Sequence, residues 1–266
     1  MQPSVTTERT DTYVQRQHSA ATATIGFTDL RGLTMDQLTG PPEETARWLQ
    51  AAARFGVVEG QTALGQILLD GHGITRDRCA AARWFSIAAE AGHPPAINML
   101  GRCHELGWGV PVDLVQAADC YRRATETGLD WGQYNFANLL LRGRGVTRDR
   151  KAALALYRSA TEQGHAKSMN MLGRFMEEGW EMPRDSRAAA DWYRRAAEAG
   201  DFRGQYNFAS VLALAGDIPQ AETWLHRAME TATPAFLTLM SVRLANSPEP
   251  PLRRISAIAA GHAKRD

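Results

Sequence analysis

A glycine recurs every 36 residues over most of the chain, and this period constrains the fold more than any other feature of the sequence. The recurring glycines are Gly56, Gly92, Gly128, Gly164 and Gly200. Within each interval a second glycine, an aspartate, an alanine and an aromatic residue also keep their places. In the first interval these residues are Gly71, Asp77, Ala81 and Phe85. Agreement at so many positions predicts a stack of similar units, each too small to bury its own apolar faces.

Each interval contains the signals of two helices. Leu64, Ile67 and Leu68 have helical spacing and predict a first helix. Gly71 follows as a left-handed C-cap, and Asp77 stands where the N-cap of a second helix is expected. The sequence therefore predicts an all-α fold, a right-handed superhelical α-solenoid of helix-turn-helix repeats.

The ends of the array divide the chain into three parts. Residues 1–41 are polar and are predicted to be mostly disordered. Residues 42–231 form the solenoid, and 232–266 a C-terminal capping helix and a basic tail, although Leu252–Ala260 could form a further helix. The solenoid consists of a half repeat at 42–56, full repeats at 57–92, 93–128, 129–164 and 165–200, and a shortened repeat at 201–231.

The repeat resembles the Sel1-like repeat, a long-looped relative of the tetratricopeptide repeat. The match rests on Ala63-Leu64-Gly65, Gly71-His72-Gly73-Ile74, Asp77 and Ala82-Arg83-Trp84-Phe85, and on their counterparts in later repeats. The sequence departs from the pattern at Cys120 and Leu156, which replace a tryptophan, and at Glu181, which replaces a loop glycine and could change that loop. The resemblance implies a bacterial protein-interaction scaffold or adaptor in a signalling, stress or assembly pathway.

Motifs that carry catalysis are missing from the sequence. It has no Walker-type phosphate loop, no Gly-x-Ser-x-Gly elbow and no Cys-x-x-Cys pair. His72, Cys79, Cys103 and His104 could meet as a metal site, but they occupy ordinary helix or loop positions of the repeat. His93 and His165 are expected to be helix-end residues. We therefore predict a non-enzymatic protein without a cofactor or a metal, and a metal-binding enzyme remains an alternative.

Charge and hydropathy restrict the partners. Thirty basic and twenty-nine acidic residues give a net charge of +1, so no overall field attracts nucleic acid. The second helices carry an arginine ridge, but acidic residues alternate with it, which favours a salt-bridged face. A nucleic-acid-binding helical repeat protein remains the alternative. The ridge comprises Arg83, Arg122, Arg123, Arg158, Arg194, Arg195 and Arg227. Three cysteines, no signal peptide and no long apolar stretch predict a cytoplasmic protein without membrane contact.

Outward positions of the first helices are the candidate partner-binding surface, a concave groove by analogy with other repeat arrays. The groove candidates are Asn98, Arg102, Glu105, Trp131, Tyr134, Asn135, Asn138, Arg142, Arg174, Glu177, Tyr206 and Asn207. Trp108 and Trp180 are edge candidates. The alternatives are that the aromatic and asparagine residues are packing residues of the repeat, and that the tryptophans fold back onto their loops. The expected partner is a protein or peptide, bound by a monomer or weak homodimer.

Overall fold

The computed structural model describes residues 40–263, which contain helices and no strand. Residues 1–39, for which the sequence predicts disorder, lie outside this range, as do residues 264–266. The chain divides into two compact units, unit 1 up to Asp149 and unit 2 from Arg150 onward, and each is described by itself.

In the described part of unit 1, residues 40–149, six helices follow one another, and each packs on the next in sequence. They are α3 (Pro42–Arg54), α4 (Val58–Asp70), α5 (Arg78–Glu90), α6 (Pro94–Leu106), α7 (Leu114–Glu126) and α8 (Asp130–Arg142). The first of them is the half repeat: α3 has the place of a second helix and packs directly on α4.

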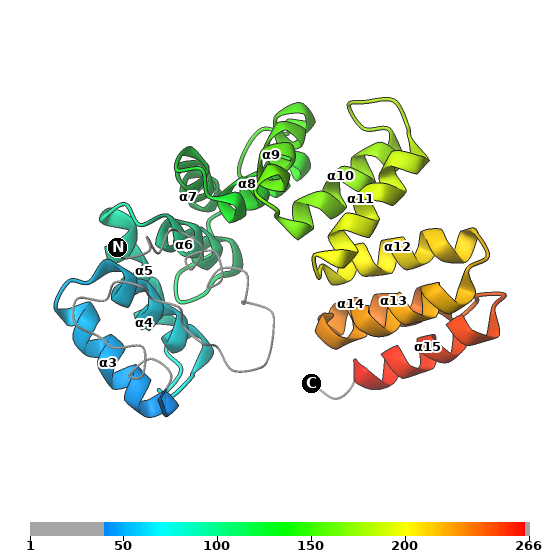
Figure 1. Cartoon of the computed structure of the whole chain (residues 1–266). Coiled ribbons are helices and arrows are strands. Elements are labelled where there is room, and N and C mark those ends of the chain that lie inside the picture. The colour runs from blue at the N-terminus through cyan, green and yellow to red at the C-terminus, as the bar shows by residue number, and fades with distance from the viewer. Residues whose placement is uncertain (1–39, 264–266) are drawn as a thin grey trace, which may run out of the picture. The chain divides into compact units, whose positions relative to one another are not determined.

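Unit 2 continues the pattern with seven helices. They are α9 (Arg150–Glu162), α10 (Ala166–Glu178), α11 (Ser186–Glu198), α12 (Phe202–Leu214), α13 (Ile218–Thr231), α14 (Pro234–Leu244) and α15 (Pro250–His262). Figure 1 shows α12, α13 and α15 lying alongside one another. The described chain thus confirms an all-α fold with consecutive helix packing, whereas the right-handed superhelix stays a prediction.

The end of the chain contains the further helix that the sequence offered at Leu252–Ala260. Two helices follow α13, and α15 packs on both α13 and α14. Leu252, Ile255 and Ala259 recur at helical spacing, and all three are buried. This apolar stripe lets α15 complete the core at this end with Met240 of α14, which is fully buried.

The predicted caps are present at the ends of the helices. Gly71 and Gly107 end α4 and α6 with φ values of 77° and 70°, in the left-handed region. Asp77 begins α5 and accepts a hydrogen bond from the backbone N–H of Ala80 at 2.8 Å. Asp113 and Asp185 cap α7 and α11 in the same way.

Small residues in the first helices admit the aromatic rings of the second helices. Gly101 faces Tyr121, whose side chain is completely buried, and a Cβ at Gly101 would lie 2.7 Å from the ring. Gly65 faces Phe85 and Gly173 faces Tyr193 in the same manner. The rings can therefore pack directly on the backbone of the neighbouring helix, which places the first and second helices of a repeat close together.

Replacing Gly71 or Gly107 by valine is expected to lower the free energy of unfolding by ~1–3 kcal/mol. A β-branched residue strongly disfavours a φ near 70°. Urea denaturation followed by circular dichroism measures the loss. No loss at either position would contradict the left-handed cap.

Candidate partner-binding surface

In unit 1 the first-helix surface is formed by α6 and α8. Asn98, Arg102 and Glu105 lie at positions i, i+4 and i+7 of α6 and so share one face. Asn135 of α8 donates a hydrogen bond from Nδ2 to Oδ1 of Asn98 at 2.8 Å. This bond joins the first helices of two successive repeats.

Glu105 is the centre of a small polar network. Its Oε2 accepts a hydrogen bond from the Tyr121 hydroxyl at 2.8 Å, and its Oε1 lies 3.3 Å from Nη1 of Arg144. Burial of Tyr121, together with this carboxylate, raises the pKa of its hydroxyl well above the usual value. Tyr121 therefore stays protonated and donates to Glu105.

Trp108 folds back onto the protein. The guanidinium of Arg102 lies 4.6 Å from the centre of the Trp108 ring, and the indole packs against the core cluster that includes Phe85. Burial lowers the pKa of Arg102, because a charged group loses hydration there. The structure thus favours the fold-back alternative at Trp108.

The remaining candidates of unit 1 lie along α8. The rings of Trp131 and Tyr134 meet edge to face with centres 6.2 Å apart. Asn138 donates a hydrogen bond to the carbonyl oxygen of Tyr134 at 3.0 Å. Arg142 is exposed at the end of the helix, while Tyr134 and Asn138 are half-buried.

Unit 2 presents an equivalent surface on α10 and α12. Asn207 donates to Asn170 at 2.7 Å, and the Tyr193 hydroxyl donates to Glu177 at 2.6 Å. Arg174 lies 5.5 Å from the centre of the Trp180 ring. Trp180 also meets Phe175 edge to face at 5.4 Å, so this tryptophan folds back as Trp108 does.

Two of the candidates do not point outward as expected. Asn98 is 4% exposed and Tyr206 is 7% exposed. Asn98 is covered because it bonds to the next repeat, and Tyr206 because its ring packs against Phe236 of α14. Both therefore support the surface from beneath.

Three residues of these networks, Asn170, Tyr121 and Tyr193, are not among the candidates predicted from the sequence. A second period of 72 residues, twice 36, could have revealed them. The segment Asn-Met-Leu-Gly-Arg stands at 98–102 and again at 170–174, and Gly-Gln-Tyr-Asn-Phe-Ala at 132–137 and 204–209. Identity at this doubled spacing marks the two surfaces as copies of one pattern.

The possible metal ligands do not assemble in the structure. Within residues 40–263 no group of three or more His, Cys, Asp or Glu side chains could hold a metal ion. Cys79 is exposed and Cys103 buried, and burial raises the pKa of the Cys103 thiol to about 12. His93 and His165 are the N-cap residues of α6 and α10, as expected of helix-end residues.

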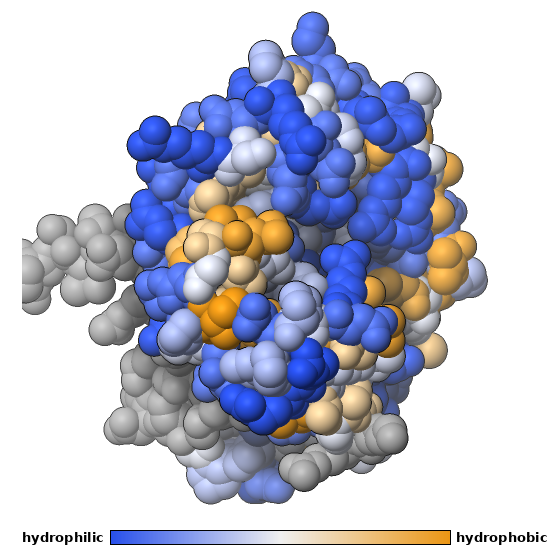
Figure 2. Space-filling view, turned by 90° about the vertical axis from the view of Figure 1, so that its right-hand side faces the viewer, coloured by the Kyte–Doolittle hydropathy of each residue, from blue (hydrophilic) through white to orange (hydrophobic). Residues whose placement is uncertain are grey.

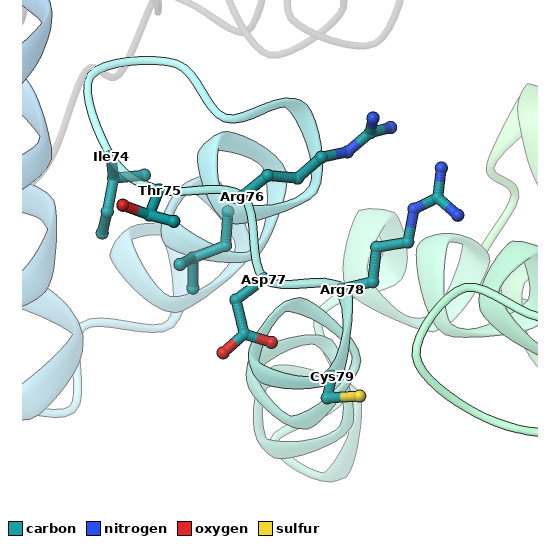
Figure 3. Close-up of a pocket in the computed structure, with 7 residues that line it drawn as sticks. Ile74, Thr75, Arg76, Asp77, Arg78 and Cys79 are labelled. Atoms are coloured by element: carbon teal, nitrogen blue, oxygen red, sulfur yellow. The ribbon is translucent and has the colours of Figure 1, made fainter.

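A hollow in unit 1 is lined by the turn that connects α4 and α5. Its lining consists of Leu68 and residues 74–79, and Figure 3 shows Arg76 and Arg78 extending to the same side, away from Ile74. Arg76 donates from Nε to the carbonyl oxygen of Leu69 at 2.8 Å, and Asp77 caps α5. The polar groups of this hollow therefore serve the ends of two helices.

Two arginines of the ridge on the second helices pair with carboxylates of their own helices. Arg122 pairs with Asp119 at 2.6 Å and with Glu126 at 2.5 Å. Arg194 repeats the arrangement with Asp191 and Glu198. These pairs match the predicted salt-bridged face at Arg122 and Arg194.

The fold and this surface define a helix-turn-helix repeat protein. The model of the family described as Sel1 repeat matches residues 58–93, 94–129, 132–165 and 166–201, which together exceed half of the chain. The chain belongs to the Sel1 repeat family. No helix among the described residues has the length and apolar character required to span a bilayer.

Several solved structures share the fold. A Sel1 repeat protein from Oxalobacter formigenes is 23% identical over 83% of this chain and 94% of that chain, with a TM-score of 0.70. A protective antigen of uropathogenic Escherichia coli with an SLR fold is 28% identical over 84% of this chain, with a TM-score of 0.60. The match spans 49% of that antigen, about half of its length. An immunity protein from Pseudomonas aeruginosa is 15% identical over 77% of this chain and 80% of that chain, with a TM-score of 0.56. A comparison with curated proteins found no match.

Proposed function

We propose that the protein is a non-enzymatic scaffold that binds a protein or peptide partner with the first-helix surfaces of its repeats. The observation that carries this proposal is the duplicated network of asparagine, arginine, glutamate and aromatic side chains on α6–α8 and on α10–α12. Hydrogen bonds and ring stacking already hold these side chains in place. These side chains would therefore lose little conformational entropy when a partner binds them.

The residue types on these surfaces suit protein recognition. Tyr134, Trp131 and Arg142 belong to the types that contribute most at protein interfaces. Asn138 is half-buried, and its bond to the Tyr134 carbonyl oxygen holds this polar side chain in place on the surface. By contrast, Arg122 and Arg194 on the second helices are already paired within the chain. Figure 2 shows one face of the molecule, on which most residues are hydrophilic and the apolar residues gather in separate patches.

The groups available for catalysis support a binding role over an enzymatic one. Burial raises the pKa of Cys120 to about 11, and a protonated thiol is a poor nucleophile. Burial lowers the pKa of His93, whose Nδ1 bonds to the Thr62 hydroxyl at 2.8 Å. The name of the Pseudomonas neighbour, an immunity protein, is in keeping with a protein partner. A cytoplasmic adaptor that is a monomer or weak homodimer is the corresponding proposal for the whole protein.

Exchanging the exposed part of the unit 1 surface is expected to abolish partner binding. The triple variant Tyr134→Ala/Asn138→Ala/Arg142→Ala removes outward groups and leaves the Asn98–Asn135 bond intact. Interface anchors of this kind contribute ~1–4 kcal/mol each, so retention of the partner should fall at least about tenfold. Affinity capture from a lysate of the producing cell, with quantification of retained proteins, measures the effect.

A matched control tests the location of the site. Arg83→Ala/Arg158→Ala removes two exposed arginines from the second helices α5 and α9 and should retain the partner. A partner that is held by the triple variant and lost by this control would contradict the proposed surface. Recovery of nucleic acid in place of a protein would contradict the proposed function itself.

A further inference from the structure

The two copies of the network differ at the central glutamate. In unit 1 the Glu105 carboxylate is shared between the Tyr121 hydroxyl and the Arg144 guanidinium, and its side chain is 21% exposed. In unit 2 Glu177 keeps the tyrosine bond, to Tyr193, but forms no ion pair with any described residue. Glu177 is exposed. Half of the site that binds a guanidinium in unit 1 is therefore present but open in unit 2.

The shortened last repeat explains the difference. Arg144 stands in the loop that follows α8, two residues after the end of that helix. The residue 72 positions later is Gly216, which lies in a tight turn that leads directly into α13 at Ile218. This turn has neither the loop nor the basic side chain that covers Glu105. Unit 2 therefore has the glutamate and its tyrosine but no internal counterpart of Arg144.

An exposed leucine accompanies the open glutamate. One antiparallel helix, α11, separates α10 from α12, so these two helices run in the same direction. Asn170 and Asn207 bond to each other, and two turns further along the same faces stand Glu177 and Leu214. Leu214 is 90% exposed, and its counterpart in unit 1 is Arg142. A carboxylate and an aliphatic side chain thus lie at the same level of this surface.

We propose that Glu177 binds an arginine side chain of the protein partner, in the place that Arg144 takes at Glu105. A guanidinium donates to a carboxylate in a planar, charge-assisted arrangement, and the Glu177 oxygen not bonded to Tyr193 is available for it. The aliphatic part of the arginine covers Leu214 while its charged end reaches Glu177. Lysine fits less well because its ammonium lacks the planar fork. This inference rests on the proposed function and specifies the partner: a basic segment with an exposed arginine.

Synthetic peptide pools test the inference with the full chain. The pools are immobilised 12-residue peptides with Arg, Lys, Gln or Glu fixed at the centre and random flanks. Wild-type protein is expected to be retained about fivefold better by the arginine pool than by the glutamine pool. The substitution Glu177→Gln keeps an acceptor for Tyr193 and should abolish this preference, and Glu177→Arg should transfer it to the glutamate pool. Glu178→Gln, an exposed neighbour, is the matched control and should behave like wild type.

A gain of binding provides a second test. Arg144→Ala frees Glu105, and Arg142→Leu supplies the aliphatic neighbour that Glu177 has in Leu214. Calorimetric titration of this double variant with the best-retained arginine peptide should then change from one bound peptide per chain to two. A ratio that stays at one would overturn the equivalence of the two networks and with it the inference. Equal retention of the arginine and glutamine pools by wild type, or an arginine preference that survives Glu177→Gln, would also overturn it.

The outcomes separate this inference from the proposed function. Retention of peptides without an arginine preference, lost in the Tyr134/Asn138/Arg142 triple variant, would support a scaffold and overturn the arginine site. Retention of no pool would overturn both.

Discussion

Replacing Gly109 by alanine is expected to lower the free energy of unfolding by about 3–5 kcal/mol, the largest single effect we predict. Gly109 has a φ of 75°, and its loop lies on the start of α5 in the preceding repeat. A Cβ there would overlap the carbonyl oxygen of Arg78 and come within 2.7 Å of the Cys79 nitrogen. These are backbone atoms, so relief requires that the loop separate from α5. Urea denaturation measures the change.

Gly128→Ala separates the effect of the clash from that of the backbone conformation. Gly128 also has a positive φ, 84°, but a Cβ there would have no heavy atom within 4 Å. Its loss should therefore be only ~1 kcal/mol. Equal losses for the two variants would show that the contact with α5 contributes nothing. Glu181 stands 72 residues after Gly109, at the same position of its loop, and has a φ of 58°. Because glycine adopts this left-handed conformation without strain, Glu181→Gly should raise the free energy of unfolding by up to ~1 kcal/mol in the same urea denaturation.

Acidification from pH 6.5 to pH 5 is expected to destabilise the wild type by ~2 kcal/mol more than the variant His165→Asn. Nδ1 of His165 accepts the backbone N–H of Ser168 as the cap of α10, which requires an unprotonated nitrogen. Burial, with a contribution from Lys167, lowers the pKa of His165 to about 3. Asparagine keeps the capping function but does not titrate.

The direction of this effect follows from proton binding. Between pH 6.5 and pH 3 the histidine takes up a proton in the unfolded chain but not in the folded one. The free energy of unfolding therefore decreases as the pH is lowered, by up to ~1.4 kcal/mol per pH unit. Burial raises the pKa of Asp201, which acts in the opposite sense, and lowers that of His93. Both groups are present in the wild type and in the variant. The urea midpoints of the two proteins are measured at pH 6.5 and pH 5, and the difference between the two pH-dependent changes isolates the contribution of His165. Parallel pH curves would contradict a buried neutral His165.

The repeat made most of the fold predictable. Each helix end depends on a local rule, such as the left-handed glycine at Gly107 or the aspartate cap at Asp113, and such rules act within a few residues. The last helix was harder to predict, because Leu252–Ala260 follows prolines and lies outside the period. Its helix, α15, is stabilised by the apolar face that α13 and α14 leave uncovered.

The candidate surface was predicted less completely. A position within the repeat indicates which face of a helix a residue occupies, but not what the neighbouring repeat places against it. For this reason Asn98 and Tyr206 were expected to point outward and are buried. The networks around Glu105 and Glu177 join residues 16 positions apart through Tyr121 and Tyr193, which a pattern of helical faces does not reveal.

The sequence by itself determined the family, the helices, their caps and the small residues that allow close packing, because a 36-residue period imposes the same local rules on each repeat. The tertiary structure decided which polar side chains are shared between helices and which remain available. Glu105 and Glu177 occupy the same place in the sequence pattern, yet one is paired with Arg144 and the other is open. The physical reason is that an ion pair depends on the spatial neighbour, and a four-residue shortening one repeat further along removes that neighbour.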